Sequence, residues 1–275
     1  MSKKWWNNVL AFCRWLVLKD DLYGLQRREN GRFSWSRIAL YEWLPFFQGL
    51  LDLQRELNKS ITNVNLGEHS DAIKLYLMVY RKHLSKGSLS LLRGHLTDCF
   101  LSLRSSIEIV AFAALVKTDP RLANQWLSAW EDDQSYRLYK SQFSAKSIFK
   151  ASNPLLKDLS KRYDYCSRLC HPSIYAVYPH FNFLEEGPKT KAKLEEFEIN
   201  INKNVSDQPV LLMILQYFIE TNLCILRLFR EVISSGNDDW EKNLMALASS
   251  FEEQKRDVQE QVVLSLRAEY KRLFP

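Results

Sequence analysis

Glycine and proline are scarce in this sequence, with eight of each among 275 residues. All-β proteins need such turn-forming residues about every ten positions. A chain with so few of them is better suited to long helices joined by short connections. Hydrophobic residues make up 46% of the chain, which is enough to bury a substantial core. The composition therefore predicts an all-α fold, organised as a multi-helix bundle.

Cysteine is also scarce, and its five positions form no C-x-x-C pair. An odd number of cysteines inside apolar patterns indicates neither a disulfide framework nor a zinc site. The five histidines are scattered and form no recognised metal-ligand motif with carboxylates, so we expect no metal and no cofactor. This cysteine usage predicts a protein of the reducing cytoplasm.

The sequence lacks the motifs of several large enzyme classes. It contains no G-x-x-x-x-G-K-S/T phosphate loop, no G-x-G-x-x-G, no H-E-x-x-H and no G-x-S-x-G. Nucleotide hydrolysis, dinucleotide binding, zinc proteolysis and the chemistry of α/β-hydrolases therefore lose their usual support. Any catalysis must use a different set of side chains.

Acidic residues are outnumbered, and the formal net charge is +6. The basic residues gather between residues 3 and 37 and again between residues 137 and 150. Such grouping is a signal for binding a polyanion. An ordinary solvated basic surface is the alternative that fits the same pattern.

The N-terminal residues 5–18 are rich in tryptophan and aliphatic side chains but include Asn7, Asn8 and Arg14. These polar residues and the lack of a small-residue cleavage site speak against a signal peptide. We expect an amphipathic helix that packs on the protein. Peripheral contact of this helix with a membrane surface is the alternative.

Hydrophobic periodicity predicts helices through most of the chain. The expected helices span residues 41–57, 70–84, 88–116, 120–131, 154–171, 210–229 and 238–273. The third and sixth are apolar enough to approach a membrane span, but each carries one polar stripe, which favours a buried bundle helix. In the sixth, the stripe of Gln216, Glu220 and Arg227 is expected to face solvent.

Three regions follow from this pattern. We expect a basic, amphipathic helical extension at residues 1–60, the helical bundle at residues 61–237, and a charged helix at residues 238–275 that packs on the bundle or on a partner. Within the bundle, residues 180–203 alternate at period two, which predicts a small inserted β-hairpin. A disordered loop is the alternative.

The segment over residues 163–173, Y-D-Y-C-S-R-L-C-H-P-S, has the arrangement of a site. A proline directly after His171 cannot continue a helix, so His171 should lie in the last helical turn. At helical spacing Asp164 and Arg168 share its face, and Ser167 lies four residues before it. The helix C-terminus would favour the cationic form of His171.

A second polar pair, Arg104 and Glu108, lies four residues apart on the apolar helix at 88–116. We expect the two helices to bring this pair and His171 together. Such residues suit RNA phosphodiester cleavage without a metal, because histidine can carry the proton and arginine can stabilise the phosphorane charge. Ordinary intrahelical ion pairs and a histidine that caps its helix are the structural alternative.

The R-x-x-x-E pair of Arg104 and Glu108 is followed some sixty residues later by Y-x-x-x-S-x-x-x-H-P, which begins at Tyr163 and ends after His171. This pattern, over about residues 70–235, resembles the HEPN-like (higher eukaryotes and prokaryotes nucleotide-binding) all-α proteins of bacteria. The resemblance implies a four- or five-helix bundle that is usually dimeric. Many members are metal-independent endoribonucleases of toxin, antiphage or RNA-processing systems, and others only bind nucleotides or partner proteins.

The chain departs from the active members of that family in one respect. They separate an arginine from the histidine by four to six residues, whereas here two residues separate Arg168 from His171 and eight separate Arg162 from it. Either Arg168 or Arg104 would have to take the role of the family's arginine.

These observations lead to the hypothesis of a cytoplasmic, HEPN-like protein that binds or cleaves RNA in a toxin or antiphage defence system. The candidate site residues are His171, Arg168, Arg104, Glu108, Ser167 and Asp164. The histidine is the expected proton carrier and the arginines are the expected phosphate-binding groups. RNA and a partner protein or second copy of the chain are the expected partners. The alternative is a non-catalytic interaction module, in which the same polar cluster fixes helix packing.

Overall fold

The computed structural model describes residues 26–62, 70–149, 153–170, 208–233 and 238–273, apart from positions 28 and 130. Within these ranges the elements are helical and there is no strand. The prediction of an all-α bundle is therefore confirmed. The expected β-hairpin at residues 180–203, the expected amphipathic helix at residues 5–18 and the side chain of His171 lie outside the described residues.

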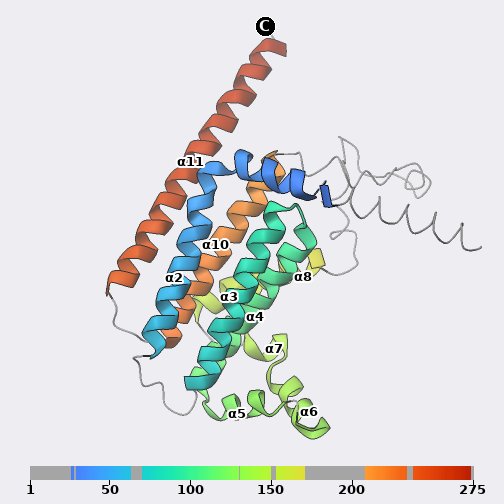
Figure 1. Ribbon diagram of the computed structural model, residues 1–275, viewed down its shortest axis with the longest axis vertical. Coiled ribbons are helices and arrows are strands. Elements are labelled where there is room, and N and C mark those ends of the chain that lie inside the picture. The colour runs from blue at the N-terminus through green and yellow to red at the C-terminus, as the bar shows by residue number, and fades with distance from the viewer. Residues whose placement is uncertain are drawn as a thin grey trace, which may run out of the picture.

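The described chain begins with helical residues 26–27 and 29–39 and the short η1 (Tyr41–Trp43). The longer helices are α2 (Leu44–Thr62), α3 (Ser70–Leu92), α4 (Leu96–Thr118), α8 (Pro154–Cys170), α10 (Gln208–Ile233) and α11 (Asp238–Leu273). Three short helices, α5 (Arg121–Leu127), α6 (Asp133–Gln142) and α7 (Ala145–Ile148), connect α4 to α8 and gather at one end of the bundle (Figure 1).

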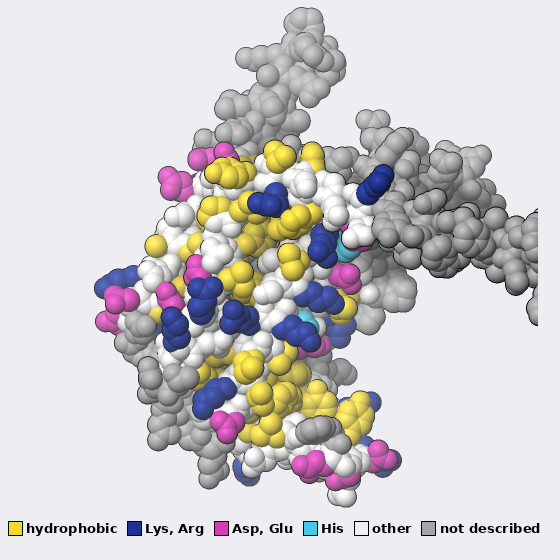
Figure 2. Space-filling view, in the orientation of Figure 1, with side chains coloured by type: hydrophobic (Ala, Val, Ile, Leu, Met, Phe, Trp, Pro, Cys, Tyr) yellow, Lys and Arg dark blue, Asp and Glu magenta, His cyan; other side chains and the backbone are white. Residues whose placement is uncertain are grey.

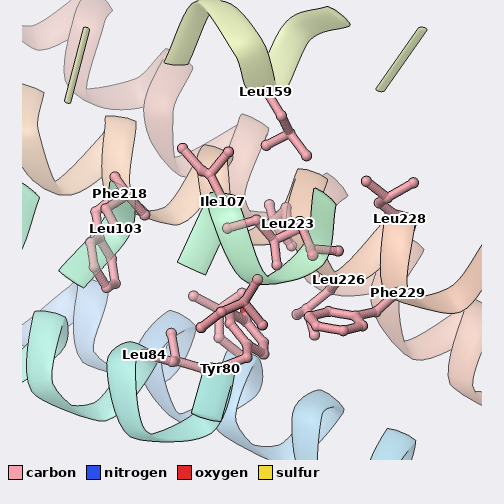
Figure 3. Close-up of a cluster of buried hydrophobic side chains, with 14 of the residues drawn as sticks. Tyr80, Leu84, Leu103, Ile107, Leu159, Phe218, Leu223, Leu226, Leu228 and Phe229 are labelled. Atoms are coloured by element: carbon pink, nitrogen blue, oxygen red, sulfur yellow. The ribbon is translucent and has the colours of Figure 1, made fainter. Parts of the chain in front are cut away.

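Helix α4 lies at the centre of the bundle, where it packs against α3, α8 and α10. Its residues Leu103 and Ile107 are at most 1% exposed. Figure 3 shows them among side chains from the neighbouring helices, including Tyr80 of α3, Leu159 of α8 and Phe218 of α10. Burial of such apolar surface is the main favourable contribution to folding. The apolar sequence of α4 therefore follows from its central position.

Two stretches, Leu96–Thr118 and Leu211–Ile233, are long and apolar enough to cross a membrane by length and composition alone. The most apolar part of each is 61% buried inside the bundle. The core helix of a globular protein has the same length and composition. Their burial fits the expectation that both are bundle helices.

The boundary between α3 and α4 differs from the predicted one. The periodicity placed a break at residues 85–87, but α3 continues through Gly87 to Leu92. A Cβ atom on Gly87 would come within 2.7 Å of Cε2 of Phe218, so this glycine permits a close approach of α3 to α10 rather than a turn. The turn uses Gly94 instead, whose φ of 77° is a left-handed conformation that glycine adopts without strain.

Helix α8 begins as the sequence predicts. The Asn153 side chain accepts hydrogen bonds from the backbone N–H groups of Leu155 (2.8 Å) and Leu156 (3.4 Å), and Pro154 occupies the first helical position. An asparagine cap followed by proline satisfies or removes backbone donors that a helix start leaves unpaired. This cap sets where α8 starts and hence which of its residues meet α4.

Helix α11 packs along α2 and α10, and its C-terminal part continues beyond the end of the bundle (Figure 1). Trp240 is 1% exposed, and its indole N–H donates to the backbone carbonyl of Leu53 at 2.9 Å. Farther along, the buried ring of Phe251 makes edge contacts with the rings of Trp43 and Phe46. These contacts anchor the first half of α11 on the bundle.

The predicted solvent-facing stripe of α10 is partly covered by α11. The Glu220 carboxylate accepts a hydrogen bond from Lys255 of α11 at 2.6 Å and lies 3.6 Å from the Arg162 guanidinium of α8. The expectation of a solvent-facing edge was wrong for Glu220. The periodicity of α10 shows that this face is polar, but it cannot show that a helix farther along the chain packs on it.

Candidate functional site

Three polar side chains meet where α4 lies against α8, and we call them the Arg104 cluster. They are Arg104 and Glu108 of α4 and Tyr163 of α8. The Tyr163 hydroxyl donates to Oε1 of Glu108 at 2.8 Å, and Nη2 of Arg104 donates to the same hydroxyl at 3.0 Å. Nη2 also lies 3.3 Å from Oε1 of Glu108, and the guanidinium carbon lies 5.1 Å from the centre of the Tyr163 ring.

The cluster forms because one side of α4, which carries Arg104 and Glu108, packs near the stripe of α8 that contains Tyr163. Arg104 and Glu108 are four residues apart, so they lie on the same side of α4. Tyr163 belongs to the stripe of α8 that packs on α4, with Leu159 and Cys166 also buried. The side chains of Arg104 and Glu108 are 24% and 29% exposed, so the cluster lies at the edge of the core. Its groups are shielded enough to interact strongly and open enough to reach solvent.

The protonation states in the cluster follow from its geometry. Burial opposes the charge of Arg104, but the Glu108 carboxylate and the Tyr163 hydroxyl outweigh it and raise the pKa of the guanidinium. Burial also raises the pKa of Tyr163, and its hydrogen bond to Glu108 adds to this rise while Arg104 opposes it. At neutral pH Arg104 is therefore cationic, and Tyr163 is a hydrogen-bond donor rather than a base.

Two donors at this junction of helices have no hydrogen-bond partner among the described residues. Arg104 Nε and Ser167 Oγ are buried atoms that bond to none of the described residues. A guanidinium carries five N–H donors, and the hydrogen bonds of Arg104 within the described chain use only Nη2. Buried donors normally find a partner, because an unpaired one costs about 1–3 kcal/mol. The cluster therefore has donor capacity for an additional acceptor.

The remaining predicted site residues divide between two sides of α8. Ser167 lies one helical turn beyond Tyr163 and is partly buried, whereas Asp164 and Arg168 are exposed. The structure thus brings Arg104 and Glu108 together with Tyr163, but it does not bring Asp164 or Arg168 into the cluster. His171 directly follows the last residue of α8 and lies outside the described part of the chain.

The structure adds a group of residues on α3 that the sequence did not predict. Burial lowers the pKa of His83, and Lys82 and Lys86 lower it further, whereas Glu108 of α4 raises it. His83 is therefore neutral at pH 7, and its buried Nδ1 has no partner among the described residues. The sequence shows the order K-H-x-x-K, but the approach of His83 to Glu108 depends on how α3 packs on α4.

The face that α3 and α4 present carries several basic side chains. Figure 2 shows Lys and Arg side chains across the middle of this face, with apolar and some acidic side chains between them. Arg81, Lys82 and Lys86 of α3 are all exposed. We call these three residues and Arg104 of α4 the basic face.

The cysteines of the described chain are buried or partly buried free thiols at positions 99, 166, 170 and 224. Burial raises the pKa of Cys166 to about 12 and that of Cys170 to about 11. Both are protonated at neutral pH and are poor nucleophiles. Within the described ranges, no group of three or more histidine, cysteine, aspartate or glutamate side chains is placed to hold a metal ion.

Comparison with known proteins adds no identification to this geometry. No protein-family model, no curated protein and no solved structure matches the chain. The functional interpretation therefore depends on the side chains themselves.

Proposed function

We propose that this protein binds RNA on the basic face and acts as a HEPN-like component of a bacterial toxin or antiphage defence system. The single observation that carries the proposal is that Arg104 is held in place but has unused hydrogen-bond donors. Its guanidinium is fixed by Glu108 and Tyr163, yet Nε and Nη1 make no hydrogen bond to any described residue. A positioned arginine with free donors is suited to the oxygens of a phosphate group.

The surroundings of Arg104 support a polyanion rather than a single small anion. The pKa of His83 is lowered by Lys82 and Lys86 of α3 and raised by Glu108 of α4. Charged side chains from both helices therefore lie around this histidine. Several cations on one face match the repeated charge of a nucleic-acid backbone. The same two helices also expose apolar side chains, Leu101 at 42% and Met78 at 62%.

RNA cleavage without a metal is the catalytic form of this proposal. In it His171 carries the proton, and Arg104 and Arg168 bind the phosphate. In the sequence His171 directly follows Cys170, the last residue of α8. Tyr163 keeps its proton and donates a hydrogen bond to Glu108, which holds Arg104 in place.

A non-catalytic interaction module is the second candidate, and one observation favours it. The hydrogen bonds of Arg104, Glu108 and Tyr163 join α4 to α8, so the cluster contributes to packing whether or not it binds RNA.

The salt dependence of RNA binding tests the proposed face. The double variant Lys82→Gln/Lys86→Gln is expected to bind single-stranded RNA more weakly, because two phosphate contacts are lost. The slope of log K against log salt should become shallower by about 1.4, since each contact to single-stranded nucleic acid contributes about 0.7. Fluorescence anisotropy of a labelled RNA, titrated with the full-length protein at several salt concentrations, measures both quantities.

The matched control removes two lysines elsewhere. Lys157→Gln/Lys242→Gln changes the net charge equally, at exposed positions of α8 and α11. We expect this control to retain the wild-type slope. Equal slopes for both double variants would show that RNA, if bound, does not lie on the basic face.

A further inference from the structure

A hollow lies at the end of the bundle that the short helices form. Its volume is about 760 Å³, and its walls come from Leu75 of α3, Trp126 and Leu127 of α5, and Tyr136 and Tyr139 of α6. Pockets that bind ligands commonly have volumes of about 300–1,000 Å³. In Figure 2 apolar side chains gather at this end of the molecule, beside a group of acidic ones.

The aromatic side chains that line the hollow pack against one another and against aromatic residues of the core. Trp126 makes an edge contact with Tyr76, with ring centres 4.5 Å apart. Tyr139 stacks on Phe143 at 5.3 Å, and Tyr136 stacks on Tyr139 at 6.1 Å. Since Tyr76 and Phe143 belong to the core, the rings that line the hollow have fixed positions. A ligand would meet a surface that is already formed.

The hollow leaves apolar surface uncovered. Leu75, Leu127 and Tyr136 are 39%, 37% and 46% exposed, although they belong to three different helices. Because these side chains line one hollow, they offer a ligand a shared apolar surface. Its occupant should therefore offer apolar groups.

The rim of the hollow is acidic. Glu131, Asp132 and Asp133 are consecutive and border the same space. Asp132 caps α6, because its Oδ1 accepts from the Ser135 backbone N–H at 2.8 Å and its Oδ2 from the Ser135 hydroxyl at 3.0 Å. The carboxylates of Glu131 and Asp133 are both exposed, so they remain to attract a cation.

One cation–π contact already exists beside the hollow. The ammonium group of Lys140 lies 4.7 Å from the centre of the Tyr136 ring, although Lys140 is not part of the lining. An aromatic ring attracts cations on its face through its quadrupole. A ligand cation in the hollow would meet the same kind of aromatic surface, formed by Tyr136, Tyr139 and Trp126. The acidic rim would attract it as well.

We propose that this hollow is the docking site for a polypeptide segment of a partner protein, in which a lysine or arginine is flanked by apolar residues. The cationic side chain lies against the aromatic rings and the carboxylates of Glu131 and Asp133. Its apolar neighbours cover Leu75 and Leu127. A single ammonium ion would leave most of the volume and of the exposed apolar side chains uncovered, which is why a polypeptide fits better. The acidic rim repels RNA, so this site is separate from the basic face.

Selection from random heptapeptides displayed on phage, with the full-length protein immobilised, tests the proposal. The expected result is enrichment of sequences with lysine or arginine next to aromatic or aliphatic residues. Tyr136→Ala and the double variant Glu131→Gln/Asp133→Asn should each reduce the affinity of a synthetic selected peptide at least about tenfold, the equivalent of 1.4 kcal/mol. Asp132 and Trp126 are left unchanged because they support the fold.

The controls lie far from the hollow. Tyr41→Ala removes an exposed tyrosine from η1, and Glu253→Gln/Asp257→Asn removes two exposed carboxylates from α11. These variants should bind the selected peptide as the wild type does, and all variants should bind RNA equally. The proposal is overturned if no basic peptide is enriched, or if spermidine alone displaces the peptide at equal concentration. It is also overturned if the hollow variants convert a dimer to a monomer in sedimentation, because a second copy would then be the occupant.

Discussion

Replacing His171 with alanine is expected to lower the rate of RNA cleavage by a factor of about 10²–10⁴, which is the usual contribution of a general acid or base. The reason is that, in the proposed mechanism, His171 carries the proton to the leaving oxygen. Cleavage of a fluorescent single-stranded RNA by the full-length protein measures the effect. The assay contains a chelator, because the proposed reaction needs no divalent ion.

His180→Ala is the matched control, since it removes the next histidine in the sequence. It should retain the wild-type rate. Equal rates for the wild type and His171→Ala, with intact folding, would remove His171 from the mechanism. If His171 instead has a purely structural role, His171→Ala should reduce the free energy of unfolding by about 1–3 kcal/mol, because a buried polar partner is lost.

Replacing Trp240 with alanine is expected to reduce the free energy of unfolding by about 3–5 kcal/mol, as for other buried aromatic residues. The indole is 1% exposed, and its N–H satisfies the backbone carbonyl of Leu53. The Arg230 guanidinium also lies 5.9 Å from the ring. The variant therefore loses packing, a hydrogen bond and a cation–π contact together. Chemical denaturation followed by circular dichroism measures the loss.

Met245→Ala on the same helix is the control for Trp240. Met245 is 54% exposed, so its replacement should change the free energy of unfolding by no more than about 0.5 kcal/mol. A loss below about 1 kcal/mol for Trp240→Ala would contradict the anchoring of α11 on α2. A large loss for both variants would indicate that the helix itself, rather than the Trp240 contact, determines the effect.

Much of the fold could be predicted from local patterns. The start of α8 at Pro154 follows from the Asn153 cap, and the bounds predicted for α11 are those observed. The break between α3 and α4 was misplaced because glycine has two uses. Gly87 serves close packing inside a helix, and Gly94 serves a left-handed turn, and only the three-dimensional structure distinguishes them.

The short helices α6 and α7 escaped prediction for a different reason. Helix α6 contains mostly polar residues, and its apolar side chains are the two tyrosines that line the hollow beside α5 and the exposed Leu138. A short helix with few core residues lacks the long apolar stripe from which helices are recognised. Its stability comes from the Asp132 cap and from stacking on Phe143, which depend on tertiary contacts.

The candidate site could be predicted only in part. The spacing of Arg104 and Glu108 correctly put them on one face of α4, and α8 does supply a partner for them, Tyr163. The sequence did not show which side of α8 packs against α4. Tyr163 lies on the packed side, whereas Asp164 and Arg168 are exposed. His83 was missed because its approach to Glu108 joins residues of two different helices, which no local pattern encodes.

The affinity of the Arg104→Gln variant for single-stranded RNA tests the proposed basic face most directly. Glutamine keeps a polar side chain of similar reach but removes the charge and the guanidinium donors. We expect binding to weaken about tenfold to a hundredfold, because a hydrogen bond to a charged group contributes about 1.5–3 kcal/mol. Arg55→Gln, on the exposed surface of α2, should bind RNA as the wild type does. Equal affinity of the wild type and Arg104→Gln, with the helical fold intact, would contradict the assignment of this face to RNA.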